Sequence, residues 1–130
     1  MNKKSIYAIE NIIISINELM ILTKDKDVNY FYDSYEMPIL CELVNDVNKS
    51  ISKINSKVKK KYSFVNWEII NQFKEDDNGV KILNLGKVWD LASNLLEKQL
   101  YQNMMKILKL ELPVYYKNYS IKKHNKKINN

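Results

Sequence analysis

The sequence contains no arginine, one cysteine, one histidine, two glycines and two prolines among its 130 residues. So few glycines and prolines exclude a turn-rich all-β protein and favour helices. A single cysteine excludes an intramolecular disulfide. Proteins without disulfides are typical of a reducing compartment, so we predict a cytoplasmic protein. The absence of arginine excludes bidentate recognition of phosphate or guanine. Because lysine, asparagine, isoleucine and tyrosine are abundant, we attribute this composition to an AT-rich genome.

The residues that most often carry chemistry are scarce as well. Cys41 falls in an apolar helical run and is interpreted as a core residue, because buried thiols are inert. His124 lies in a C-terminal segment without a rigid frame, so we expect no nucleophile–histidine arrangement. Gly79 and Gly86 begin no phosphate-binding glycine motif. Carboxylates that are distant in sequence can meet in space, which leaves paired-carboxylate catalysis open. The interpretation is a protein without catalytic residues, metal or cofactor.

Positive charge is concentrated at the C-terminal end of the chain. Residues 1–112 hold 16 lysines against 15 acids, whereas residues 113–130 hold five lysines and no acid. This predicts a nearly neutral helical domain over 1–112 and a basic, partly disordered tail over 113–130. No apolar run approaches the roughly 18 residues of a membrane span. We therefore expect no association with a membrane.

Apolar residues recur every three or four positions in three long segments, which predicts amphipathic helices. These segments are residues 4–22, Leu40–Val58 and Leu85 to about Leu110. A short helix or turn is expected around Tyr30–Tyr35, and a short helix over Trp67–Phe73. The predicted fold class is all-α, an antiparallel bundle of four to five helices.

Several residues are candidates for the ends of these helices. Ser5 is a possible N-cap of the first helix. Pro38 suits the first turn of the second long helix, where a missing N–H costs little. The same helix is expected to end at Lys59–Lys61, because cations favour a helix C-terminus. Pro113 marks the end of the last helix or a kink in it.

An acidic segment stands between the only two tryptophans of the chain. Its residues are Lys74, Glu75, Asp76, Asp77 and Asn78, followed by a glycine. Asp-Asn-Gly is strong turn chemistry, which predicts an exposed loop. The alternating oxygen ligands and distal glutamate of a calcium loop are absent. Acidic loops suit contact with a basic protein, because complementary charge raises the association rate. We expect these five residues to contact a protein partner.

Lysine-rich segments indicate a second kind of partner. The candidate nucleic-acid contacts are Lys59, Lys60, Lys61, Lys122, Lys123, Lys126 and Lys127. The tyrosines could stack on bases beside them, but Tyr7, Tyr62 and Tyr101 lie in or beside apolar stripes, so packing is the preferred interpretation. Lysines at a helix C-terminus and in a terminal tail are also explained without any ligand, as cations at the negative end of a helix and as a solvated extension.

The order of these features resembles the HEPN family of small helical-bundle proteins, in its HepT-like branch. The resemblance covers about residues 6–100. It is carried by Ile9–Leu22, Tyr30–Tyr35, Leu40–Val58, Trp67-Glu68-Ile69-Ile70 and Val88-Trp89. The resemblance implies a helical bundle that forms a homodimer through its helices.

The active members of that family are RNases that use an arginine, a short polar gap and a histidine shortly after the first tryptophan. At the equivalent position this chain has Lys74-Glu75-Asp76-Asp77-Asn78, with neither arginine nor histidine. Lysine cannot present a planar fork, and no side chain there titrates near neutrality as imidazole does. The resemblance therefore implies a degenerate member that does not cleave RNA by the family mechanism.

These observations lead to two hypotheses of different classes. The first is a non-catalytic protein-interaction module of a prokaryotic or phage conflict system, acting as an antitoxin, immunity protein or inhibitor. The alternative is an RNA-binding protein, or an atypical HEPN-type RNase toxin, that uses the lysine-rich segments. A third reading is a purely structural subunit of a larger assembly.

Overall fold

The computed structural model describes residues 1–32, 34–70 and 85–114, and these residues form helices, turns and loops without a strand among them. The elements are α1 (Lys3–Thr23), α2 (Val28–Phe31), α3 (Met37–Ser52), α4 (Ser56–Lys61), α5 (Leu85–Asp90) and the π-helical segment η2 (Leu91–Tyr101). Residues 102–114 continue η2 as α-helix. We call the continuous stretch from α5 to residue 114 the C-terminal helix. The prediction of an all-α helical bundle is confirmed.

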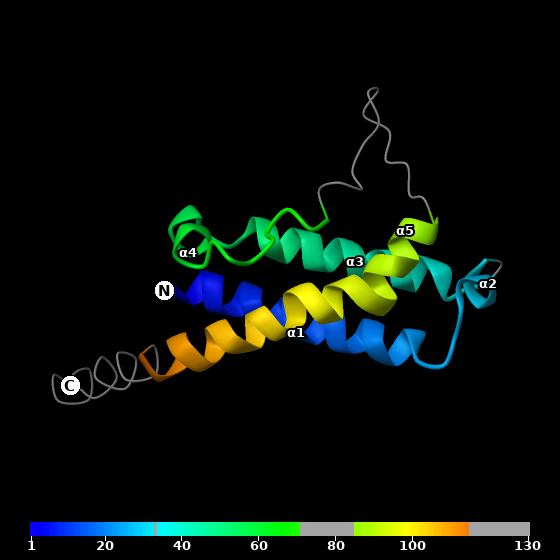
Figure 1. Cartoon of the computed structure of the whole chain (residues 1–130), viewed down its shortest axis with the longest axis horizontal. Coiled ribbons are helices and arrows are strands. Elements are labelled where there is room, and N and C mark those ends of the chain that lie inside the picture. The colour runs from blue at the N-terminus through cyan, green and yellow to red at the C-terminus, as the bar shows by residue number, and fades with distance from the viewer. Residues whose placement is uncertain (33, 71–84, 115–130) are drawn as a thin grey trace, which may run out of the picture.

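Three long helices make up the body of the bundle. Figure 1 shows α1, α3 and the C-terminal helix side by side, with α1 running opposite to the other two. α1 packs against both α3 and η2. One end of the bundle holds the N-terminus, α4 and the end of the C-terminal helix, whereas α2 and α5 lie at the other end (Figure 1).

The core is centred on the apolar stripe of α1. Ile9, Ile12, Ile16 and Leu19 are completely buried, at the three- and four-residue spacing that the sequence predicts. By length and composition alone α1 is also apolar enough to cross a membrane, with a mean hydropathy of 1.4. The expectation that no segment approaches a membrane span therefore needs correction. In this structure the apolar stripe of α1 packs inside the bundle instead.

The cap of α1 is not the one predicted. Asn2 has extended backbone angles, and its Oδ1 accepts a hydrogen bond from the Ser5 N–H at 2.8 Å. This is the geometry of an N-cap, which satisfies a backbone donor that has no partner inside the helix. Ser5 is instead completely buried, and its hydroxyl oxygen accepts a hydrogen bond from the Asn55 N–H at 3.4 Å.

The predicted continuous helix over Leu40–Val58 is wrong, because the chain breaks between α3 and α4. Asn55 is extended, with φ −72° and ψ 160°, and its Oδ1 accepts a hydrogen bond from the Val58 N–H at 2.9 Å. A side chain that caps the backbone in this way competes with helix continuation. Ile54 and Val58 stay buried across the break, so the periodicity gives no sign of it.

Pro38 lies in the first turn of α3, as predicted. Lys59–Lys61 form the last turn of a helix, as predicted, but that helix is α4, because α3 already ends at Ser52. The C-terminal helix passes the predicted boundary at residue 112 and reaches Val114, the last described residue. The predicted tail beyond it lies outside the described residues.

The two tryptophans contact different parts of the bundle. Residues 67–70 form turns rather than the predicted helix. The indole N–H of Trp67 donates to the carbonyl oxygens of Lys59, at 3.2 Å, and Tyr62, at 3.1 Å. The ring of Trp89 lies 5.2 Å from that of Phe31 between centroids. Trp67 therefore fastens the segment after α4, and Trp89 packs on α2.

Because α1 is central to the bundle, substitution of two of its isoleucines should change the free energy of unfolding by very different amounts. Ile12 is completely buried, whereas Ile14 is 55% exposed. Ile12→Ala should lower the free energy of unfolding by about 2–5 kcal/mol, because it leaves a cavity in the core. Ile14→Ala should change it by less than about 0.5 kcal/mol. Urea unfolding measures both, and equal losses would contradict the placement of α1.

Candidate functional site

Most of the predicted contact residues lie outside the part of the chain that the structure describes. This applies to the expected partner contacts over Lys74–Asn78 and to Lys122, Lys123, Lys126 and Lys127. Of the candidate nucleic-acid contacts only the three lysines of α4 are described. Lys60 and Lys61 are exposed and Lys59 is half-buried.

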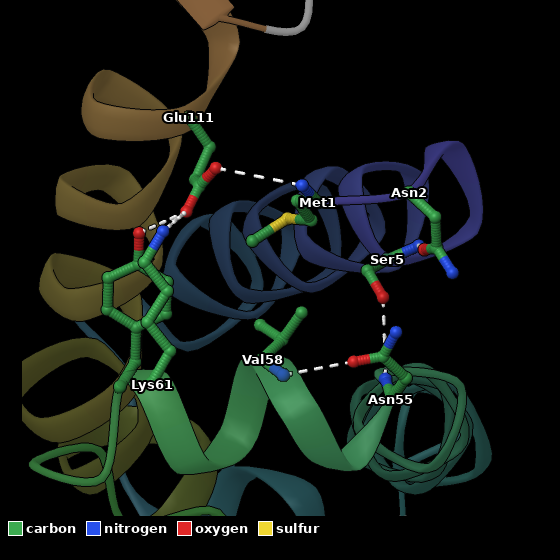
Figure 2. A network of polar contacts seen from close by, with 8 residues as sticks. Met1, Asn2, Ser5, Asn55, Val58, Lys61 and Glu111 are labelled. Atoms are coloured by element: carbon green, nitrogen blue, oxygen red, sulfur yellow. Dashed lines mark hydrogen bonds and ion pairs between the residues drawn. The ribbon is translucent and has the colours of Figure 1, made fainter.

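The clearest polar cluster of the described residues surrounds Glu111 at the N-terminal end of α1 (Figure 2). The Glu111 side chain is 8% exposed. Its Oε1 accepts hydrogen bonds from the Lys61 ammonium, at 2.8 Å, and from the Tyr62 hydroxyl. Its Oε2 lies 3.9 Å from the amino group of Met1. The carboxylate therefore joins the C-terminal helix to the end of α4 and to the start of α1.

The pKa shifts in this cluster follow from its hydrogen bonds. Hydrogen bonds from Lys61 and Tyr62 lower the pKa of Glu111 and outweigh the opposing effect of burial. Burial, followed by the hydrogen bond to Glu111, raises the pKa of Tyr62. The hydrogen bond to Glu111 also raises the pKa of Lys61. At neutral pH the cluster therefore contains a carboxylate, a phenol and an ammonium group.

A second set of contacts lies next to the Glu111 cluster. Figure 2 shows Asn2, Ser5, Asn55 and Val58 at the same end of the bundle. Through them the first turn of α1 meets the first turn of α4. Both sets of contacts hold helix ends together, and no described side-chain N or O atom that is deeply buried lacks a hydrogen-bond partner. We interpret the Glu111 cluster as a structural clamp.

The chemistry of the described groups agrees with that interpretation. A residue that acts as a catalytic acid or base at neutral pH needs a pKa close to neutrality. The pKa of Glu111 is lowered and that of Tyr62 is raised, so both lie further from neutrality than usual. Burial raises the pKa of the half-buried Cys41 thiol, which disfavours the reactive thiolate. The described residues contain no group of three side chains able to hold a metal ion.

The outer side of α1 carries a different feature, a line of exposed apolar side chains. Tyr7, Ile14 and Ile21 are 49%, 55% and 76% exposed. Their spacing of seven residues places them along one side of the helix, opposite the core stripe. We call these three residues the α1 face.

A groove of about 590 Å³ lies beside the α1 face, between α1 and the C-terminal helix. Met20 and Ile21 line it from α1, and Trp89 and Ser93 line it from the C-terminal helix. Polar residues including Asp25 complete its lining; Asp25 adopts a left-handed conformation, with φ 59°, in the turn after α1. The groove thus combines apolar walls with polar residues, as binding grooves often do.

Sequence reasoning missed Glu111, although a signal was present. Leu100, Met104 and Ile107 are completely buried, and the next position of the same stripe, four residues on, is Glu111. A carboxylate on a buried stripe needs partners that satisfy its charge. Those partners come from α4, which the periodicity of the C-terminal helix does not reveal.

Comparison of the chain with models of protein families, with curated proteins and with solved structures finds no match. The class of protein is defined by the fold alone, which is an all-α helical bundle. Membership of the HEPN family stays a prediction that rests on the order of sequence features.

The lowered pKa of Glu111 predicts how stability depends on pH. Its contribution is complete above the ordinary pKa of 4.5 and is lost as the pH falls through the lower pKa of the folded state. Glu111→Gln should reduce the free energy of unfolding by about 1 kcal/mol at pH 7, because a charged hydrogen-bond acceptor becomes neutral. The difference from the original protein should vanish in acid.

Urea unfolding of both proteins from pH 7 down to pH 3 measures this difference. Glu42→Gln is the matched control, since Glu42 is an exposed residue of α3, and it should unfold like the original protein at every pH. If the Glu111→Gln variant lost as much stability between pH 7 and pH 3 as the original protein does, the lowered pKa of Glu111 would be contradicted.

Proposed function

We propose that this chain is a non-catalytic module that binds a helix of a protein partner along the α1 face. The setting we propose is a prokaryotic or phage conflict system, in which the chain acts as an antitoxin, immunity protein or inhibitor. The observation that carries the proposal is the line of Tyr7, Ile14 and Ile21, all exposed on the helix that organises the core.

The spacing of these residues supports a helical partner. Single exposed apolar side chains are normal on protein surfaces. Three such residues at intervals of seven on one helix are different, because a second helix packed alongside would bury all three in one seam. α1 would then bury apolar residues on both sides.

The groove extends this surface toward the C-terminal helix. Lys24, Lys26 and Glu97 are among its polar lining residues, and polar residues around an apolar centre are typical of protein interfaces. A partner helix that lies on the α1 face could place a large apolar side chain against Met20 and Trp89. The proposed partner is thus an amphipathic helix rather than a small molecule.

The acidic segment remains part of the proposal on sequence grounds. Glu75, Asp76 and Asp77 would attract a basic partner and raise its association rate. The absence of arginine and histidine from Lys74–Asn78 supports a non-catalytic role within the HEPN resemblance. Homodimer formation is the competing use of the α1 face.

Co-expression of the full chain with each product of its neighbouring genes tests the proposal. One of them should co-purify with it, and Ile14→Lys or Ile21→Lys should weaken that complex about thirtyfold or more, as loss of an interface hot spot does. Replacing Glu75, Asp76 and Asp77 with alanine should slow association without changing dissociation.

The control is Ile39→Lys, which alters an isoleucine of α3 that is 45% exposed and should leave binding unchanged. Two results would contradict the proposal. One is that no neighbouring gene product binds. The other is that Ile14→Lys abolishes only self-association, which light scattering detects.

A further inference from the structure

The lysines of the described chain gather at one end of the bundle. Residues 1–10, 49–66 and 104–114 hold ten lysines and two acids. Figure 1 shows these three ranges together at the end that carries the N-terminus and α4. We call them the basic end. The other described residues hold four lysines and nine acids, so a nearly neutral domain is divided into a positive end and a negative remainder.

The positive charge of the basic end faces the solvent. Nine of its ten lysines are exposed, and Lys59 is half-buried. Of its two acids, Glu10 is half-buried and Glu111 is buried beneath the ammonium of Lys61. Little negative charge is therefore left to offset the lysines, and the local surface attracts anions.

An exposed aromatic ring lies among these lysines. Phe64 follows α4 and is 56% exposed. The Lys106 ammonium lies 5.3 Å from the centre of its ring, and the Tyr62 ring meets it edge to face at 6.2 Å. Phe64 is thus held between α4 and the C-terminal helix, with lysines on both elements.

We infer that the basic end binds single-stranded nucleic acid. The phosphates contact Lys57 and Lys60 on α4 and Lys106 on the C-terminal helix, and a base stacks on Phe64. A basic surface with an exposed aromatic ring is the usual arrangement for binding single strands. Lysine provides point charges without a planar fork, so binding depends little on base sequence. These contact residues differ from those of the α1 face, Tyr7, Ile14 and Ile21, so the inference does not depend on the proposed protein-binding function.

α4 itself offers no apolar face to an anionic membrane. A helix that lies on a membrane inserts an apolar face beneath its lysines. The apolar residue of α4, Val58, is 6% exposed, and the adjoining Tyr62 is 5% exposed. Both face the core, so α4 has only charged and polar side chains to offer to a ligand.

Fluorescence anisotropy with labelled oligouridine and oligothymidine of equal length tests the inference on the full chain. Both should bind, and the logarithm of the affinity should fall with that of salt concentration by about 0.7 for each phosphate contacted. Lys57→Glu combined with Lys60→Glu should weaken binding and reduce that slope. Phe64→Ala should weaken binding about five- to 150-fold through lost stacking, and Phe64→Trp should retain it.

Matched controls lie outside the basic end. Lys24→Glu with Lys98→Glu makes the same charge change at two exposed lysines, and Tyr35→Ala removes a ring that is 84% exposed. Both controls should bind like the original chain. Circular dichroism establishes that each variant keeps its helices.

Four results would overturn the inference. The first is an absence of binding to either oligonucleotide at low salt. The second is equal weakening by the basic-end and control charge reversals. The third is binding that depends only on Lys122, Lys123, Lys126 and Lys127 when these are changed to glutamine. The fourth is that phosphatidylserine vesicles or polyglutamate bind as tightly as the oligonucleotides do, and that Phe64→Ala does not change this binding. If only oligouridine binds, the ligand is RNA; binding of both identifies single strands in general.

Discussion

Burial of the apolar stripe of α1 is the constraint on which the rest of the structure depends. The stripe packs against α3 on one side and against the C-terminal helix on the other, and this holds both helices beside α1. The break before α4 then brings Asn55 to Ser5, and the end of the C-terminal helix brings Glu111 to Lys61. The polar contacts at this end are consequences of the core rather than an independent centre of chemistry.

The same packing produces two surfaces of different character, one basic and one apolar. The ends of α1, α3 and the C-terminal helix, together with α4, bring their lysines to one end of the bundle, although the sequence distributes them over more than a hundred positions. The α1 face is apolar and runs along the outer side of the central helix. A chain with these two surfaces can hold a protein and an anionic polymer by different forces, one through apolar burial and the other through charge.

The spacing of apolar residues in the sequence correctly predicted where the amphipathic helices lie. The first helix was expected over residues 4–22 and is observed over Lys3–Thr23. The break at Asn55 escaped prediction, because the buried positions Ile51, Ile54 and Val58 keep helical spacing across it. The outcome there depends on a local side-chain hydrogen bond that competes with the helix.

Features that depend on tertiary packing could not be predicted in this way. Net charge summed along residues 1–112 concealed the basic end, since periodicity does not say which helix ends meet. Glu111 stood on an apolar stripe, but its partners come from another element. The predicted contacts over Lys74–Asn78 and the HEPN resemblance depend on sequence alone and stay predictions.

We propose, as the central claim, that this bundle acts by binding through different sets of residues and carries out no chemistry on what it binds. The most direct measurement is nuclear magnetic resonance of the isotope-labelled full chain during titration with oligouridine, with the integrity of the oligonucleotide followed in the same sample. The account predicts shifts confined to residues 57–64 and 106–110, unchanged signals from Ile14 and Ile21, and intact RNA. Shifts centred on the α1 face, or cleavage of the oligouridine, would contradict it.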